Sequence, residues 1–283
     1  MSKASHINKK ILSDQLLGKP VEYHDIYQPL LLRTVPRSFS RKLLSFDLNQ
    51  IKLTGEDIWT LYEISWLNQK GLPQVAIGEL VLDIRSTNLI ESKSLKLYLN
   101  SFNQTRFSNL EAVQKTIEHD LNYYAIGFVR VTLFQLEDAR DKTIGHLNGV
   151  CIDKQDISIS NYELNPHYLK NSTAQDIVEE QLVSHLLKSN CLITKQPDWA
   201  TIQISYHGFR IYHEPLLRYL ISYRKHYEFH EQCAERIFHD ILKYCKPNKL
   251  SVYIRYTRRG GIDINPWRSN TEYVPYLTRL VRQ

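Results

Sequence analysis

Hydrophobic and polar positions follow one order of elements in the first half of the chain. Runs rich in aromatic and β-branched residues predict strands, and apolar positions at a spacing of three and four predict helices. The predicted order is strand, strand, helix, helix, strand, strand. The segments are 56–67, 74–85, a helix from about Ser92, a helix from Asn109 to about Tyr123, 127–136 and a strand near 147–160.

The second half repeats this order about 120 residues later. Its predicted elements are strands at 177–188 and 200–207, helices at 214–226 and 230–245, and a strand at 250–256. The pattern of 177–188 fits a helix equally well, and only the repetition favours a strand. An antiparallel sheet with helices packed on one face suits this order, so the sequence predicts an α+β fold.

Composition narrows the class of protein. The 283 residues carry a net charge of +6, with 42% hydrophobic and 23% charged residues, which is typical of a globular protein. A moderate positive charge favours an anionic small ligand over nucleic acid. No run of 18 apolar residues predicts a membrane span, and residues 1–10 do not resemble a secretory signal. We therefore expect a cytoplasmic protein with no nucleic-acid or membrane partner.

The cysteines and histidines do not predict a metal centre. Cys151, Cys191, Cys233 and Cys245 form no Cys-x-x-Cys pair. His226 and His230 lie four residues apart, as helical ligands often do, but no third ligand accompanies them. We expect no metal.

The segment 189–199 holds candidate chemistry, because Cys191 precedes Asp198 by seven residues with Pro197 between them. A thiol acts as a nucleophile once a neighbouring group takes its proton. Residues seven apart on a continuous strand point to opposite faces, but Pro197 interrupts the strand. A loop here would turn Asp198 back towards Cys191. The alternative is a buried cysteine beside an ordinary turn.

Three further segments have unusual residues. Glu91-Ser92-Lys93 stands at a strand-to-helix junction, where Ser92 would cap the helix. Glu228-Phe229-His230-Glu231 begins another helix, where acidic residues suit a structural role. Residues 256–261 end a strand with two arginines and two glycines, which suits phosphate contact or a tight hairpin.

Together these segments resemble the NADPH-dependent 7-cyano-7-deazaguanine reductases in their long, two-module form. The resemblance lies in residues 91–104, 191–198, 229–231 and 256–268. It implies two tandem tunnelling-fold modules, each an antiparallel four-stranded sheet with two helices on one face. The expected domains are an N-terminal extension at 1–50, a first module at 51–165 and a second module at 166–283. The resemblance also implies a homodimer.

The resemblance implies reduction of a nitrile to a primary amine through a covalent thioimide. Cys191 would attack the nitrile carbon, Asp198 would transfer its proton, and His230 would assist a later protonation. Glu91 and Glu231 would accept the N–H groups of the base, with Ile90 and Ser92 helping and Phe229 covering the ring.

NADPH is expected to contact Ser92, Lys93, Arg259 and Gly260. No G-x-G-x-x-G motif is present, so the cofactor rests on the resemblance alone. Because Glu91 and Cys191 belong to different halves, we expect the pocket where the halves meet. The alternatives are another purine- or pterin-binding enzyme of the same fold, or a non-catalytic base- or RNA-binding protein.

Overall fold

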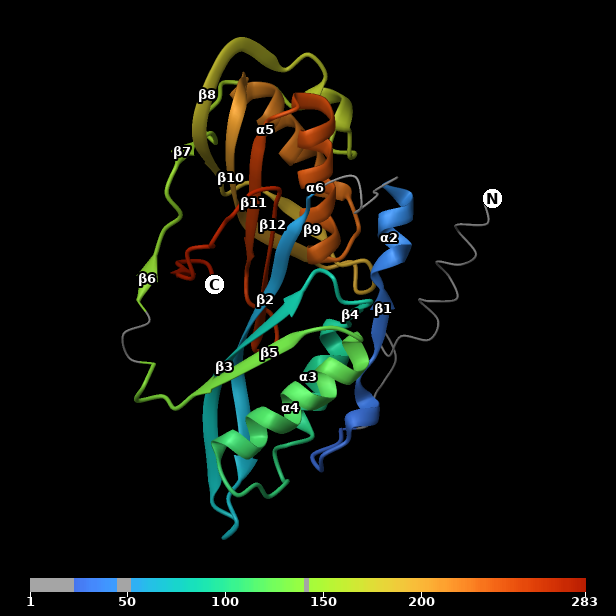
Figure 1. Cartoon of the computed structure of the whole chain (residues 1–283), viewed down its shortest axis with the longest axis vertical. Helices are drawn as coiled ribbons and strands as arrows, with labels where there is room; N and C mark the ends of the chain where they lie inside the picture. Colours follow the sequence, from blue (N-terminus) through green and yellow to red (C-terminus); the bar gives the residue numbers. More distant parts are fainter. Residues whose placement is uncertain (1–22, 45–51, 140–142) are drawn as a thin grey trace. The chain divides into compact units, whose positions relative to one another are not determined.

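The computed structural model describes residues 23–44, 52–139 and 143–283, and it is an α+β fold (Figure 1). The chain divides into two compact units. Unit 1 comprises Met1–Phe39, Trp59–Arg140 and Gly260–Ile262; unit 2 comprises Ser40–Ile58, Asp141–Arg259 and Asp263–Gln283. The expected modules were contiguous segments, whereas these units interleave along the chain. In the described part of the chain, no helix has the length and apolar character needed to cross a membrane.

Unit 1 is a layer of strands with two helices. Its elements are η1 (Pro29–Leu31), β1 (Thr34–Pro36), β3 (Pro73–Asp83), β4 (Asn88–Ile90), α3 (Ser92–Asn100), α4 (Leu110–Ala125), β5 (Val129–Phe134) and most of β2 (Thr54–Leu67). The strand order is β5-β3-β2, and β3 pairs antiparallel with β5. The predicted strands and helices over 56–136 are confirmed.

Helix α4 shows why the pattern was readable. Asn109 accepts a hydrogen bond from the backbone N–H of Ala112 at 2.8 Å, which caps the helix as predicted. Val113, Ile117 and Leu121 are fully buried on one face. Burying these three side chains is worth about 1.5–3 kcal/mol each, so the apolar stripe fixes which face of the helix meets the sheet.

Unit 2 contains the repeated order of elements. Its elements are α2 (Arg37–Leu43) from Ser40 on, the first residues of β2, β6 (Ile144–Gly145), β7 (Val150–Cys151), η2 (Pro166–Leu169), β8 (Thr173–Ser184), β9 (Lys188–Asn190), β10 (Pro197–Ile211), α5 (His213–Ile221), η3 (Ser222–Lys225), α6 (His230–Cys245), β11 (Lys249–Tyr256), β12 (Ile262–Ser269) and β13 (Arg279–Leu280).

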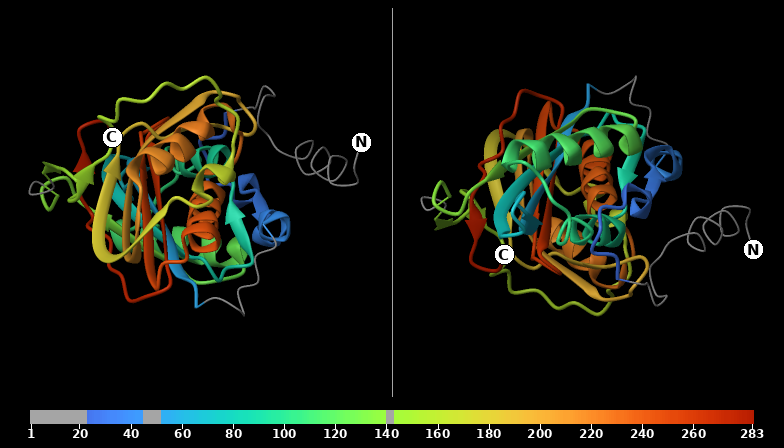
Figure 2. Two further views of the ribbon diagram at one scale, coloured as in Figure 1. Left: turned by 90° about the horizontal axis from the view of Figure 1, so that it is seen from above. Right: turned by 90° about the horizontal axis from the view of Figure 1, so that it is seen from below.

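Strands β8, β10, β11 and β12 pair in this order as an antiparallel sheet. Helices α5 and α6 lie along one face of it (Figure 2). Buried side chains of both helices join those of the strands in one hydrophobic core. The segment 177–188 is therefore mostly strand, as the repetition predicted. The four antiparallel strands with two helices on one face agree with the predicted fold, and the module bounds 166–283 stay a prediction.

The strand predicted near 147–160 is wrong for most of its length. Only Val150 and Cys151 form a strand, β7, and it pairs parallel with β8 rather than antiparallel. Residues 154–165 are irregular. The alternation around Ile157 and Ile159 resembles a strand, but an alternating segment becomes a strand only where a partner strand offers matching hydrogen bonds.

Part of the predicted N-terminal extension is built into unit 1. Strand β1 pairs antiparallel with β4, and the backbone N–H of Glu91 donates to the carbonyl of Arg33 at 2.9 Å. The hydroxyls of Tyr27 and Tyr98 both donate to Asp120 at 2.6 Å. Burial, and then the Asp120 hydrogen bond, raise the pKa of both phenols, so they stay neutral donors. Residues 23–39 thus support the segment that contains Glu91.

Candidate active site

A hairpin between β9 and β10 presents Cys191. The backbone N–H of Cys191 donates to the carbonyl of Gln196 at 2.9 Å, and the N–H of Lys195 donates to the carbonyl of Cys191 at 3.1 Å. Lys195 has a φ of 61°, the left-handed conformation that lets the loop close. The N–H of Thr194 points at the Cys191 sulfur, 3.5 Å away. The loop therefore offers the thiol a hydrogen-bond donor.

The pairing places Cys191 and Asp198 on one face of the hairpin. Asp198 pairs with Ser189, and the Cys191 to Gln196 hydrogen bond continues that register. Cross-strand partners share a face, and so do residues two apart on one strand. Cys191 and Asp198 are therefore diagonal neighbours, a relation that brings Cα atoms to roughly 7–8 Å. A loop between Cys191 and Asp198 is confirmed, but the expected break at Pro197 is wrong: the turn lies at residues 192–194, and Pro197 is the first residue of β10, where it pairs with Asn190.

Asp198 is buried between two basic side chains. One carboxylate oxygen, Oδ2, lies 3.2 Å from Nε2 of His230, and the other, Oδ1, lies 2.9 Å from Nη2 of Arg259. Asp198 is only 7% exposed. A buried carboxylate needs such partners, because burial alone disfavours its charge. The ion pair with Arg259 was not expected from the sequence, which gave Arg259 to the cofactor.

His230 is the first residue of α6 and is held by packing. Its ring stacks on the ring of Tyr256, with centroids 3.9 Å apart and an angle of 27°. Phe229 is the N-cap residue of α6, and its backbone N–H donates a hydrogen bond to Gln232 Oε1 at 3.4 Å. Glu231 is buried, and its carbonyl accepts from Arg268 Nη2 at 3.3 Å. The start of α6 thus holds three predicted site residues in fixed positions.

Glu228 anchors the segment that leads into α6. Its carboxylate accepts two hydrogen bonds from Arg236, at 2.7 and 2.9 Å, and lies 2.9 Å from Nε2 of His226. Burial opposes ionisation, yet the bonds from Arg236 and His226 hold the pKa of Glu228 below its usual value. Its backbone N–H also donates to the carbonyl of Asn190, next to Cys191. The structural role expected for this acidic residue is confirmed.

In unit 1, Glu91 is the N-cap of α3. Its carboxylate accepts the backbone N–H groups of Lys93 at 2.9 Å and Ser94 at 2.7 Å. The expectation that Ser92 caps this helix is therefore wrong: Ser92 is the first helical residue, and the longer Glu91 side chain reaches the free amides. Burial raises the pKa of Glu91, while these two amides lower it in part. Ile90 precedes it and is also buried.

A cavity of about 210 Å³ lies beside α3 in unit 1. Its lining includes Lys96, Asn100, Gly260 and Gly261. Both glycines have positive φ, 61° and 73°. A Cβ on Gly260 would lie 3.3 Å from the end of Lys96, and one on Gly261 would lie 2.4 Å from the Glu63 carboxyl carbon. The glycines therefore keep this cavity open. Ser92 and Lys93 precede Lys96 on the same helix.

The four cysteines differ in accessibility. Cys233 and Cys245 are buried, and burial raises the pKa of both thiols, that of Cys245 to about 11. Cys191 is half-buried and Cys151 is exposed. Only the last two are accessible to a ligand. The His226 and His230 pair forms no joint site, since the two rings turn to Glu228 and Asp198 respectively.

Unit 2 thus brings together Cys191, Asp198, His230 and Arg259, with Phe229 and Glu231 on the same helix start. Unit 1 holds Ile90, Glu91, Ser92, Lys93 and Gly260. The pocket expected where the two halves meet stays a prediction.

Comparisons with known proteins match both parts of the chain. The family model described as the N-terminal part of the nitrile reductase, 7-cyano-7-deazaguanine reductase, matches residues 23–133. The model described as a QueF-like protein matches residues 197–274. Among solved structures, the archaeosine synthase QueF-Like in its apo form is 19% identical, with a TM-score of 0.30; the match covers 36% of this chain and 99% of that one.

Proposed function

Because this chain belongs to the 7-cyano-7-deazaguanine reductase family in its two-module form, we propose that it reduces the nitrile of 7-cyano-7-deazaguanine to the primary amine. The observation that carries the proposal is the shared hairpin face of Cys191 and Asp198, with His230 on the carboxylate. Nucleophile, base and orienting group then stand in one cluster, the arrangement that covalent catalysis needs.

In the first step the Cys191 sulfur adds to the nitrile carbon. The S–H bond breaks, an S–C bond forms, and one π-bond of the nitrile becomes an N–H bond, which gives a thioimide without any change in electron count. Asp198 accepts the thiol proton, and a proton is returned to the nitrile nitrogen. The basic side chains on both oxygens favour the ionised carboxylate that this step requires.

His230 is placed to handle the second proton. Its Nε2 is within hydrogen-bond reach of Asp198, so the pair can pass a proton between carboxylate and imidazole. Stacking on Tyr256 fixes the ring plane and hence the direction of that transfer. His230 would supply the proton that the product nitrogen needs after sulfur leaves.

When bound, NADPH supplies hydride, and full reduction of a nitrile to an amine takes two. The cavity in unit 1, at about 210 Å³, would take only a part of such a ligand, and Gly260 leaves room there beside Lys96 where a side chain would intrude. Lys93 and Arg259 are suitable cations for its phosphates, and Ser92 supplies an N–H and a hydroxyl at a helix start. Arg259 would then leave Asp198 for a phosphate when the cofactor binds.

The base would be held by carboxylates. Each oxygen of Glu91 accepts one backbone N–H and keeps a second lone pair for a ligand N–H. Glu231 would supply the other acceptor, Phe229 would cover the ring, and the backbone at Ile90 and Ser92 would complete the edge. A preformed cap suits recognition, since Glu91 loses little side-chain freedom on binding.

Intact-mass measurement with the nitrile base alone tests the nucleophile. Wild-type protein should gain the mass of one base, and Cys191→Ala should gain none. Cys151→Ala is the matched control, because Cys151 is the other accessible thiol, and it should still form the adduct. An adduct that survives in Cys191→Ala but not in Cys151→Ala would refute the assignment.

A second measurement tests the overall reaction. NADPH oxidation, followed optically, should require the nitrile base and should consume two NADPH for each amine formed. Adduct formation without any NADPH oxidation would leave Cys191 as a nucleophile but would rule out nitrile reduction.

A further inference from the structure

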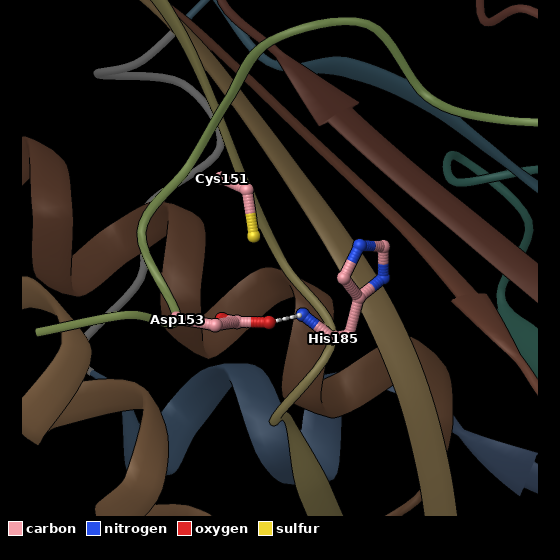
Figure 3. A group of neighbouring side chains, drawn as sticks. All are labelled: Cys151, Asp153 and His185. Carbon is pink, nitrogen blue, oxygen red and sulfur yellow. Dashed lines mark hydrogen bonds between the residues drawn. The ribbon is translucent and has the colours of Figure 1, made fainter.

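A second group of side chains in unit 2 lies outside the nitrile chemistry. Cys151 ends β7, Asp153 follows two residues later, and His185 follows the end of β8. One potential ligand atom from each of the three lies within 4.8 Å of the others. In Figure 3 the Cys151 sulfur points towards Asp153 and the ring of His185. We propose that these residues bind a divalent cation of the zinc class.

The donor set suits that class of metal. Thiolate, imidazole and carboxylate are the three ligand types that zinc takes in proteins, at about 2.0–2.3 Å. Tetrahedral geometry at those lengths puts ligand atoms about 3.5 Å apart, so no pair of ligand atoms has to approach by more than about 1.3 Å. Cys151 and His185 are exposed, so solvent rather than packed side chains surrounds the atoms that have to shift. Three protein ligands leave the fourth position to water.

The second shell orients two of the ligands. His185 Nδ1 lies 3.1 Å from the Thr201 hydroxyl, so a proton on Nδ1 leaves the Nε2 lone pair for the metal. Asp153 accepts from the Ser184 hydroxyl at 2.6 Å and from the His185 backbone N–H at 2.9 Å. Each carboxylate oxygen keeps a lone pair for coordination. Such outer hydrogen bonds are characteristic of ligating histidine and carboxylate side chains.

The backbone around the site is also fixed. The N–H of Ile152, which lies between the two ligands of the first segment, donates to the carbonyl of Val183 at 3.0 Å. Arg282 donates to the carbonyl of His185 at 2.8 Å. These bonds hold the segments in place, and together with the hydrogen bonds that Asp153 accepts they would explain the position of its side chain without a metal. They do not explain why an exposed thiol points at a carboxylate and an imidazole, and a shared cation does.

Binding would have a structural consequence. Cys151 and Asp153 immediately precede the irregular segment 154–165, at the point where the two-residue pairing of β7 with β8 ends. A metal would add a cross-link between this segment and the end of β8. Binding also displaces the thiol proton, so that S–H and M²⁺ become S–M⁺ and H⁺, and affinity should rise with pH.

Titration of the untagged protein with Co²⁺ tests the site. Wild-type protein should bind one equivalent and show a thiolate-to-cobalt charge-transfer band, which Zn²⁺ removes by displacement. Cys151→Ser should lack the band, and His185→Gln should bind at least tenfold more weakly. Two controls should bind Co²⁺ with the affinity and the charge-transfer band of wild type: Cys191→Ser, the other accessible thiol, and His119→Gln, an exposed histidine on α4.

The outcomes separate this proposal from the nitrile reaction. A charge-transfer band retained in Cys151→Ser, or lost in Cys191→Ser, would overturn the metal site. Equal affinity in wild type and His185→Gln would overturn it as well. Cys191→Ser should bind the metal while forming no adduct, so the two hypotheses fail independently.

Hydrogen exchange gives a readout of position. Zn²⁺ should slow exchange of the Ile152 and His185 amides in wild type and leave them unchanged in Cys151→Ser. Zinc that binds without slowing either amide would place the metal elsewhere and refute the assignment.

Discussion

Replacing Glu228 with glutamine tests how the hairpin that presents Cys191 and helix α6 are held together. Glu228 and Arg236 form a bidentate ion pair whose side chains are 8% and 19% exposed. Removing one partner of a buried pair costs about 3–5 kcal/mol, because the other charge stays buried. Arg236 is partly exposed, and the glutamine oxygen still accepts one bond. We therefore expect a loss of about 2–4 kcal/mol in unfolding free energy.

Thermal unfolding measures that loss. A loss of 3 kcal/mol lowers Tm by about 6–12 °C, given about 2–4 °C per kcal/mol for domains of 150–250 residues. Glu163→Gln is the matched control: Glu163 pairs with Lys225 at 3.3 Å, and both side chains are more than half exposed. That pair should be worth at most about 1 kcal/mol. Equal Tm values for the two variants would refute the argument from burial.

The pH dependence follows from the lowered pKa of Glu228. A carboxyl whose pKa is lower in the folded state stabilises the fold above its unfolded pKa, about 4.3 for glutamate, and loses that effect as pH falls through the folded value. The stability gap between wild type and Glu228→Gln should be full at pH 7 and should shrink below about pH 4. A gap that is unchanged in acid would show that the carboxylate charge is not what stabilises this segment.

Two other substitutions examine unit 1. Glu91→Gln keeps one acceptor for the α3 amides, so the unfolding free energy measured in urea should fall by only about 1 kcal/mol. The affinity of this variant for the nitrile base, measured by fluorescence titration, should fall at least tenfold. Normal binding of the base would show that Glu91 is not part of the site. Gly261→Ala should lower stability in urea by about 2 kcal/mol or more, because its Cβ would meet the Glu63 carboxyl at 2.4 Å. Gly260→Ala should cost less, since its Cβ meets the flexible end of Lys96 at 3.3 Å, and the reverse ranking would contradict the cavity geometry.

Local pattern predicted most elements. Helix α6 runs from His230 to Cys245 as expected, since Ala234, Ile237 and Phe238 recur on one buried face. The segment 177–188 was ambiguous by itself and is strand over most of its length, because β10 supplies a partner. The segment 147–160 had a similar alternation without such a partner and stayed mostly irregular. An alternating pattern therefore becomes a strand only where a neighbouring strand is available to pair with it.

The candidate site also contains features that the sequence predicted and a feature that it predicted wrongly. Cys191 and Asp198 were found together because one hairpin holds both, and a turn within eight residues is a local property. The helix cap was also local, yet the sequence favoured Ser92, because the short polar side chain is the commoner cap. Glu91 takes that role because its carboxylate lies buried over the two free amides.

The sequence by itself determined the order of elements, the core faces of the helices and the hairpin of Cys191. Only the tertiary structure decided that Arg259 pairs with Asp198, that Glu228 is held by Arg236, and that Cys151, Asp153 and His185 converge. The physical reason is distance along the chain. Periodicity reports which face of an element is buried, whereas the partner of a buried charge depends on strand register and helix packing, which bring together residues far apart in sequence.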